Sequence, residues 1–270
     1  MQVISTEVRS HIGTLWLDRP EKLNAMGTDF WTDLPAAVKS LDSDPAVRVI
    51  LVIARGRHFS VGLDLTQALL PTGGDGGPGS QSTRATHLYH KVKELQDAIS
   101  SLDYCKKPTI AAIHGYCIGG GVDLISACNI RLASRDAIFS VREAKIAIVA
   151  DIGSLQRLPQ ILPKGILYEL AMSARDFTSE EALRWGLLNE VCEDQGKLEE
   201  RSVQVAESIA NNSPVAVEGT KAILDGIYNR HLREDLDRVA LWNTSFLASN
   251  DLKEAMSAFS EKREANFRGD

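Results

Sequence analysis

Hydrophobic and polar residues follow two rhythms along the first half of the chain. Residues 3–17 alternate as strands do and predict a strand pair that turns around Gly13, whereas residues 28–41 place apolar side chains at helical spacing. The nearly continuous apolar run 47–54 is typical of a buried parallel strand, and residues 109–113 repeat it. The order strand, helix, strand predicts an α/β fold.

The last quarter of the chain changes to helical spacing throughout. Helices are predicted over 198–211, 214–228, 232–248 and 252–264. We therefore expect two regions: an α/β core over residues 1–195 that carries the functional site, and a helical region over residues 196–270. The helical region is expected to form trimer contacts or a lid.

Glycine-rich stretches separate some of the predicted elements. Residues 70–86 are rich in Gly and Pro and predict a mobile loop before a helix over 87–102. The triple glycine 119–121 follows the strand 109–113 and opens a helix predicted over 122–131. Because glycine has no side chain, backbone N–H groups at such a helix start can approach an anionic ligand closely. The sequence therefore predicts an anion site at this turn.

Composition narrows the classes of function. The 270 residues are 44% hydrophobic with a net charge of −6 and dispersed Lys and Arg, so neither nucleic acid nor an acidic membrane is expected as partner. The cysteines lack paired spacing and the histidines lack metal-ligand spacing, so we expect reduced thiols and no metal. With no signal peptide, membrane-length apolar run or Ser-Lys-Leu ending visible, a cytoplasmic location is expected.

Four segments in combination resemble the crotonase superfamily, which has the enoyl-CoA hydratase/isomerase fold. They are residues 17–26, 56–65, 118–123 and 156–159. The resemblance implies an α/β fold, namely a crotonase-type spiral of ββα units with a C-terminal helical region, assembled as a trimer or a dimer of trimers. It implies an acyl-CoA thioester as substrate and no cofactor beyond the CoA of that substrate.

The resemblance also assigns residues to the site. Two oxyanion-hole donors map onto the backbone N–H groups of Leu63 and Gly120, which would stabilise an enolate formed from a thioester. Contacts to CoA map onto Leu23, Asn24, Ala25, Leu63, Asp64 and Leu65, with Lys262 and Lys253 expected near the phosphates. A structural role for Asp64, as the cap of a following helix, is the stronger alternative to a catalytic one.

Three acids follow the triple glycine and indicate the subfamily. Hydratases of the superfamily carry glutamates at the positions of Asp123 and Glu143 and a small residue near Asp151, so this trio resembles the Δ3,5-Δ2,4-dienoyl-CoA isomerases of unsaturated fatty acid degradation. Such a reaction needs a base at C2 and an acid at C6. We assign Glu143 to C2 and Asp151 to C6, with Asp123 tuning the pair. The reverse assignment of Glu143 and Asp151 stays open.

Other functions remain open from the sequence. An enoyl-CoA hydratase or a Δ3-Δ2-enoyl-CoA isomerase would share the fold, and a hydratase would add water to crotonyl-CoA. A 4-chlorobenzoyl-CoA dehalogenase would use the acid at position 151 as nucleophile, but those enzymes have Trp in place of Glu143. A non-enzymatic RNA-binding or scaffolding member would need a clustered basic face, which the dispersed Lys and Arg do not predict.

Overall fold

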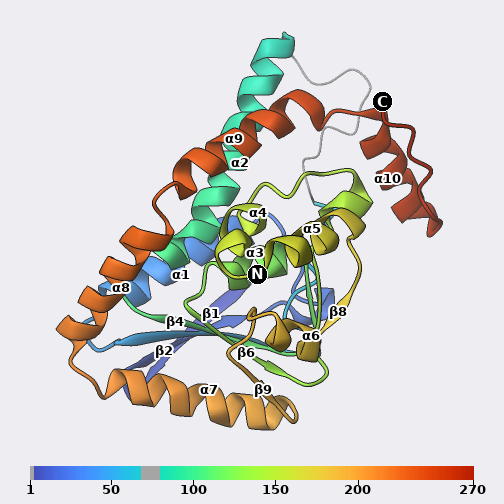
Figure 1. The fold of residues 1–270 in the computed structure, drawn as a ribbon. Coiled ribbons are helices and arrows are strands. Elements are labelled where there is room, and N and C mark those ends of the chain that lie inside the picture. The colour runs from blue at the N-terminus through green and yellow to red at the C-terminus, as the bar shows by residue number, and fades with distance from the viewer. Residues whose placement is uncertain (1–2, 68–79) are drawn as a thin grey trace.

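A six-stranded sheet forms the centre of the molecule in the computed structural model, which describes residues 3–67 and 80–270 (Figure 1). Neighbouring strands are parallel except for the first pair, which forms an antiparallel hairpin at the sheet edge. In spatial order the strands are β1 (Ile4–Arg9), β2 (Ile12–Leu17), β3 (Val49–Ala54), β4 (Thr109–Ile113), β6 (Ile130–Ser134) and β9 (Glu190–Cys192). The predicted α/β class is confirmed.

The hairpin turns at Ser10 and His11, not at Gly13 as predicted. Both turn residues have positive φ, 49° and 66°, as a tight turn between twisted strands requires. Gly13 lies inside β2, where a Cβ atom would come within 2.9 Å of the Leu41 side chain. This glycine therefore lets helix α1 (Phe30–Ser43) pack closely on the strand.

Helices cover both faces of the sheet because its strands are apolar on both sides. In β3, Ile50, Val52 and Ala54 pack toward α1, α2 (Gln81–Tyr104) and α3 (Gly120–Ser126), whereas Val49, Leu51 and Ile53 pack toward α7 (Gln195–Ala210). Figure 1 shows α7 below the sheet and α1, α2 and α3 above it. Successive side chains of a strand point to opposite faces of the sheet, so a fully apolar strand contributes to a hydrophobic core on each face.

A second sheet of three strands lies beside the first. Strand β5 (Tyr116–Ile118) pairs in parallel with β7 (Ile138–Ser140), which pairs antiparallel with β8 (Phe177–Thr178). The remaining helices before the C-terminal region are α4 (Ser154–Arg157), α5 (Lys164–Ser173), α6 (Ser179–Arg184) and the 3-10 helices Pro20–Lys22, Glu143–Ile146 and Leu158–Gln160.

The helix predicted over 122–131 is shorter than expected. Helix α3 ends at Ser126, and Ile130 already begins β6. The side chains of Asn129 and Thr109 exchange hydrogen bonds with each other's backbone N–H, which fixes the start of β6 against β4. Pairing with a neighbouring strand therefore overrides the local helical spacing.

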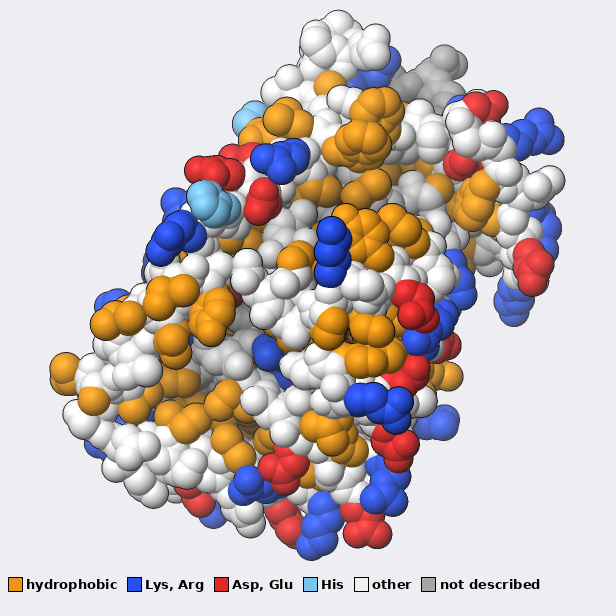
Figure 2. Space-filling model, in the orientation of Figure 1, with side chains coloured by type: hydrophobic (Ala, Val, Ile, Leu, Met, Phe, Trp, Pro, Cys, Tyr) orange, Lys and Arg blue, Asp and Glu red, His pale blue; other side chains and the backbone are white. Residues whose placement is uncertain are grey.

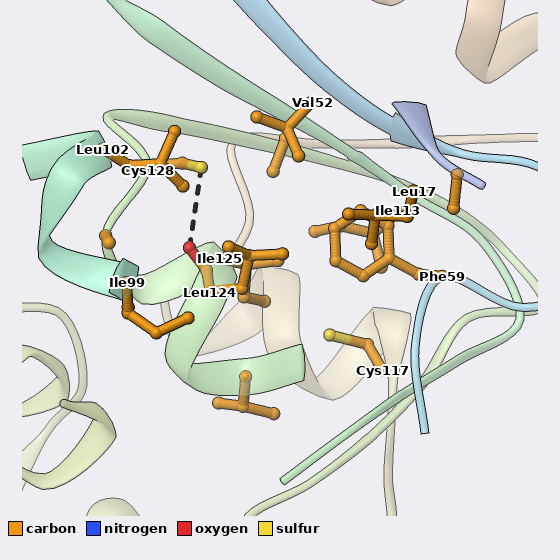
Figure 3. Close-up of a cluster of buried hydrophobic side chains, with 14 of the residues drawn as sticks. Leu17, Val52, Phe59, Ile99, Leu102, Ile113, Cys117, Leu124, Ile125 and Cys128 are labelled. Carbon is orange, nitrogen blue, oxygen red and sulfur yellow. Dashed lines mark hydrogen bonds between the residues drawn. The ribbon is translucent and has the colours of Figure 1, made fainter. Parts of the chain in front are cut away.

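Helix α3 is buried in the main core and supports the turn that precedes it. Figure 3 shows Leu124 and Ile125 of α3 packed between Ile99 and Leu102 of α2 on one side and Val52 and other strand residues on the other. The Cys128 thiol donates to the Leu124 carbonyl at 3.6 Å across this cluster. The triple-glycine turn is thus held on a rigid, fully buried helix.

The C-terminal helices are α7, α8 (Pro214–Tyr228), α9 (Leu232–Phe246) and α10 (Asn250–Glu261), close to the predicted ranges. Helix α9 runs beside α2 (Figure 1). Helix α2 begins at Gln81, six residues before the predicted start, because the Ser80 side chain caps it by accepting from the Thr83 N–H.

The predicted loop over residues 70–86 and the predicted division of the chain at residue 195 are described only in part. Positions 70–79 of the predicted loop lie outside the described residues. The division of the chain at residue 195 stays a prediction. Within residues 3–67 and 80–270, no helix has both the length and the apolar character that crossing a membrane requires.

Candidate active site

A cavity of about 610 Å³ lies where the loops after the parallel strands meet helices α2 and α10. Its walls come from four loop segments, 26–28, 61–65, 118–120 and 142–152, together with side chains of the two helices. Apart from Glu143, Asp151 and a few other polar groups, the lining is mostly aliphatic and aromatic. Such a cavity suits a long apolar group with a polar head at one end.

Two of these loops touch at glycines. Gly62 has φ +84°, and a Cβ atom there would lie 2.7 Å from the Ile118 carbonyl oxygen and 3.1 Å from the Gly120 nitrogen. Met26 holds the first loop, because its N–H donates to the Gly62 carbonyl and its carbonyl accepts from the Asp64 N–H. The two backbones therefore meet at a distance that only glycine permits.

Two backbone N–H groups at this contact have no partner among the described residues. They belong to Leu63 and to Gly120, the first residue of α3, and both residues line the cavity. The first N–H groups of a helix lack intrahelical acceptors, and the helix dipole makes this end favourable for negative charge. The pair can therefore bind one oxygen atom that gains negative charge.

Glu143 lies against the triple-glycine turn. A Cβ atom on Gly119 would be 3.2 Å from the Glu143 Oε1 atom, so this carboxyl group sits beside Gly119, the residue before Gly120. Its Oε2 atom is buried without a hydrogen-bond partner in the described structure. Burial raises the pKa of Glu143 to about 8, and the nearby negative charges of Asp123 and Asp151 add to the effect.

Asp151 lines the cavity from the loop that precedes α4. Its Oδ2 atom accepts a hydrogen bond of 2.6 Å from the Asn243 side chain of α9, and its backbone carbonyl accepts one of 2.7 Å from the Gln96 side chain of α2. Burial raises the pKa of Asp151 to about 7, although the Asn243 hydrogen bond opposes the shift. Both carboxyl groups can therefore hold or release a proton near neutral pH.

Asp123 lies behind this pair, in the first turn of α3. It is fully buried, does not line the cavity, and accepts a hydrogen bond at Oδ1 from the Ser154 N–H. Its Oδ2 atom has no partner in the described structure. Burial raises the pKa of Asp123 to about 6, against the lowering effect of the Ser154 hydrogen bonds. Its position suits an electrostatic role and not direct contact with a ligand.

The residues predicted to contact CoA fall into two groups. Leu63 and Leu65 line the cavity, whereas Leu23, Asn24, Ala25 and Asp64 are outside its lining. The Asn24 side chain bonds the backbone of Arg19, Arg55 and His58, which ties three loops together.

Asp64 also holds the loop internally. It pairs with Arg19 at 2.8 Å and accepts from the backbone and hydroxyl of Thr66, so it caps a turn and no helix. Burial acts to raise the pKa of Asp64, but the bonds from Thr66 and Arg19 outweigh it and lower the pKa. The structure thus gives Asp64 a structural role in this loop.

The basic side chain nearest the cavity at the C-terminus differs from the predicted one. Lys262 ends α10 in a left-handed conformation with φ 55°, exposed and outside the cavity lining, whereas the next residue, Arg263, lines it. Arg263 is paired with Glu254 and Glu261 on the same helix. The turn at the helix end decides which of the two neighbours faces the cavity.

Sequence reasoning missed Asn243 and Gln96. Both side chains are buried and hold the loop that carries Asp151, from helices 92 and 55 residues away in the chain. In the sequence, each is a polar residue among the apolar positions of a predicted helix. Such a pattern indicates a buried polar group but does not show which residue it bonds. Within the described residues, no cluster of three or more His, Cys, Asp or Glu is arranged to hold a metal ion.

Known proteins are similar to this chain in sequence or in fold. The chain is 43% identical over 267 residues to the peroxisomal Δ3,5-Δ2,4-dienoyl-CoA isomerase of Arabidopsis thaliana, covering 99% of this chain and 96% of the relative. It is 39% identical over 257 residues to the mitochondrial enzyme of that name from Dictyostelium discoideum, covering 95% and 87%. An enoyl-CoA hydratase from Mycobacterium avium subsp. paratuberculosis K-10 shares the fold, with TM-score 0.85, 22% identity and 98% coverage of both chains.

The relatives correct the predicted location. Their names assign the Arabidopsis protein to peroxisomes and the Dictyostelium protein to mitochondria, which contradicts the cytoplasmic location expected from the sequence. That expectation was wrong because targeting signals are short addresses read by receptors, and a search for a few known patterns does not establish a compartment.

A family model confirms the resemblance carried by the four motif segments. The model described as Enoyl-CoA hydratase/isomerase matches residues 7–270, which is nearly the entire chain. The match includes both glycine loops and all three acids of the site. The chain belongs to the enoyl-CoA hydratase/isomerase family.

Proposed function

We propose that the protein is a Δ3,5-Δ2,4-dienoyl-CoA isomerase that acts in the degradation of unsaturated fatty acids. Its substrate is an acyl-CoA thioester, as in its family. The observation that carries the proposal is the pair of titratable carboxyl groups, Glu143 and Asp151, on one apolar cavity beside two free backbone N–H groups. Relatives up to 43% identical over nearly the full chain bear this enzyme name.

The first half of the reaction makes a dienolate. The thioester oxygen accepts the N–H groups of Leu63 and Gly120, and Glu143 removes a proton from C2. The electron pair of the broken C–H bond spreads over the diene and the carbonyl oxygen, where the two N–H groups stabilise it; removing one such donor typically lowers kcat ~100-fold or more. The position of Glu143 against the Gly119 turn supports the assignment to C2, the carbon next to the thioester.

The second half returns a proton at the far end of the diene. Asp151 gives its proton to C6, the double bonds move to the 2,4 positions, and the electron pair returns to carbon. Glu143 ends protonated and Asp151 ionised, so one proton must move back before the next turnover. No electrons are exchanged with a second reactant, and we propose that the reaction uses no cofactor beyond the CoA of the substrate.

The raised pKa values of both acids support proton transfer by this pair near neutral pH. A pKa of about 8 makes Glu143 the stronger base, and a pKa of about 7 makes Asp151 the stronger acid. The reaction starts with Glu143 ionised and Asp151 protonated, so the single proton that the two acids share must lie on Asp151 at the outset. Burial is the main cause of both raised pKa values, and the negative charge of Asp123, behind both groups, adds to it.

A direct assay tests the proposal. Purified protein mixed with 3,5-octadienoyl-CoA should give the ultraviolet absorbance gain of a 2,4-dienoyl thioester, and the gain should persist after treatment with a metal chelator. Crotonyl-CoA serves as the control for hydratase activity and should gain water far more slowly. If absorbance does not rise with the dienoyl substrate, the proposal is wrong. Rapid hydration of crotonyl-CoA would instead support a hydratase.

We also propose that the protein is a homo-oligomer, a trimer or a dimer of trimers. Large apolar side chains are exposed on the outer surfaces of α8 and α9, among them Ile223, Ile227, Leu241, Trp242 and Phe246. Figure 2 shows hydrophobic side chains gathered over the region of α8 and along α9. Apolar patches of this kind on a folded chain usually mark an interface.

A further inference from the structure

Asn243 connects the C-terminal helical region to the acid that we assign to C6. It lies on α9, only 1% exposed, and its Nδ2 atom donates to Asp151 Oδ2 at 2.6 Å and to the Val149 carbonyl at 2.8 Å. Asn243 does not line the cavity, so it stands behind Asp151 and cannot be a catalytic residue. Its amide group bonds both the carboxyl group of Asp151 and the backbone of the loop that carries it.

We propose that Asn243 is a positioning residue for the second proton transfer: it holds Asp151 by Oδ2, leaves Oδ1 for the substrate, and stabilises the carboxylate that remains after C6 is protonated. The proposal rests on the proposed function. Among the described residues, no other side chain donates a hydrogen bond to the Asp151 carboxyl group.

The hydrogen bond gains strength as the reaction proceeds. An N–H donor binds a neutral carboxylic acid weakly and a carboxylate strongly, because bonds to a charged partner are shorter and roughly twice as strong. When Asp151 loses its proton, the bond from Asn243 therefore changes from the weaker to the stronger kind. An interaction that is stronger after proton transfer than before it favours the transfer.

In the part of the chain that the structure describes, no other group around Asp151 is placed to stabilise its carboxylate by a hydrogen bond from a side chain. The charged residues that act on it are Asp123 of α3 and Glu143 of the 3-10 helix, both acids, and the nearby Arg157 of α4 is committed to Asp103, Ser100 and the Ile152 carbonyl. From α2 and α9 it is met by the uncharged Gln96 and Asn243. The basic side chains elsewhere on the cavity lining are Lys91, Arg142, Lys145 and Arg263.

Gln96 provides a matched control. Its Nε2 atom donates to the backbone carbonyl of Asp151 and to that of Leu236, so it holds the same loop against the same helix pair without touching the carboxyl group. Replacing Gln96 tests whether the loop's position alone matters. Replacing Asn243 tests position and carboxylate stabilisation together.

The test compares Asn243→Leu, Asn243→Ala and Gln96→Met with the wild-type protein on 3,5-octadienoyl-CoA. For both Asn243 variants we expect kcat to fall roughly 10- to 100-fold with little change in KM, as for loss of a hydrogen bond to a charged group. The lower limit of the pH range in which the Glu143–Asp151 pair holds a single proton should move up, because the donor that favours the Asp151 carboxylate is gone. Gln96→Met should leave this pH range in place.

A measurement without substrate separates the possible failures. Carbon-13 NMR of labelled aspartates, with the Asp151 signal identified from Asp151→Asn, should report a higher pKa for Asp151 in Asn243→Leu than in wild type or Gln96→Met. A wild-type protein that does not isomerise the dienoyl substrate overturns the proposed function. An active wild type whose folded Asn243 variants keep kcat and pH range, or an equal shift in Gln96→Met, overturns the role of Asn243.

Discussion

At the scale of single residues, the site is a set of carboxyl groups with different surroundings. Asp123, Asp151 and Glu143 are all affected by burial, yet their pKa values are raised to about 6, 7 and 8 respectively. The differences follow from the hydrogen bonds each receives: Asp123 from Ser154, Asp151 from Asn243, and Glu143 from no side chain in the described structure. Side chains with the same carboxyl group are thus tuned by their neighbours.

The raised pKa values predict how stability depends on pH. Each acid binds its proton more tightly in the folded than in the unfolded chain, so its stabilising contribution is complete below about pH 4 and is lost as pH rises through about 6 to 8. Glu143→Gln removes the loss of stability that comes from ionising Glu143, the acid with the highest pKa of the three. We expect its melting temperature, relative to wild type, to rise by several degrees between pH 5 and pH 9, at about 2–4 °C per kcal/mol. A melting-temperature difference that stays constant from pH 5 to pH 9 would show that the pKa of Glu143 is not raised in the folded protein.

Gly62 gives a residue-scale prediction about activity. A methyl group at this position would press on the Ile118 carbonyl and the Gly120 nitrogen and would occupy a left-handed backbone conformation. Gly62→Ala should therefore separate the two N–H donors and lower kcat ~100-fold, as for loss of one oxyanion donor. The control is Gly165→Ala in α5, where a Cβ atom meets nothing within 4 Å and kcat should not change. Equal kcat in the two variants would argue against an oxyanion hole here.

At the scale of elements, capping residues set where helices begin. Thr178 caps α6 with a reciprocal capping box, in which its side chain accepts from the Glu181 N–H and the Glu181 side chain accepts from the Thr178 N–H. The neighbouring Ser179 is not the cap, because its hydroxyl group donates to the Arg135 carbonyl inside the fold. Local signals name candidates, and packing chooses among them.

This cap carries an element-scale prediction about stability. Thr178→Ala should lower the free energy of unfolding by about 1 kcal/mol, measured by urea denaturation, because an N–H group of α6 loses its acceptor. Thr220→Ala on α8 is the control, since that hydroxyl group bonds only the Ala216 carbonyl of its own helix. If both variants unfold at the same urea concentration, the capping box does not stabilise α6.

At the scale of the whole molecule, the helical region serves two purposes at once. The inner side of α9 holds the Asp151 loop, and its outer side exposes Leu241, Trp242 and Phe246. An interface on this outer surface would fix α9 against the core. Assembly and activity are then expected to be linked through one helix.

The oligomer prediction is tested by mass. Trp242→Glu and Ile223→Glu should each lower the molar mass measured by light scattering after gel filtration, because a charge in an apolar interface is costly. Lys197→Glu, a change of charge at an exposed position of α7 on the other side of the sheet (Figure 1), should leave the mass unchanged. A wild-type protein that elutes as a monomer of 29.5 kDa would contradict the proposal.

The sequence by itself determined the α/β class, most of the helices, the buried strands β3 and β4, and the residues of the site that belong to motifs. It did so because side-chain periodicity and glycine requirements are local properties of the chain. Only the tertiary structure decided the hairpin turn, the existence of β6, the exclusion of Asp123 from the cavity, and the part played by Asn243. These depend on which distant segments meet, and periodicity shows that a face is buried without showing what it is buried against.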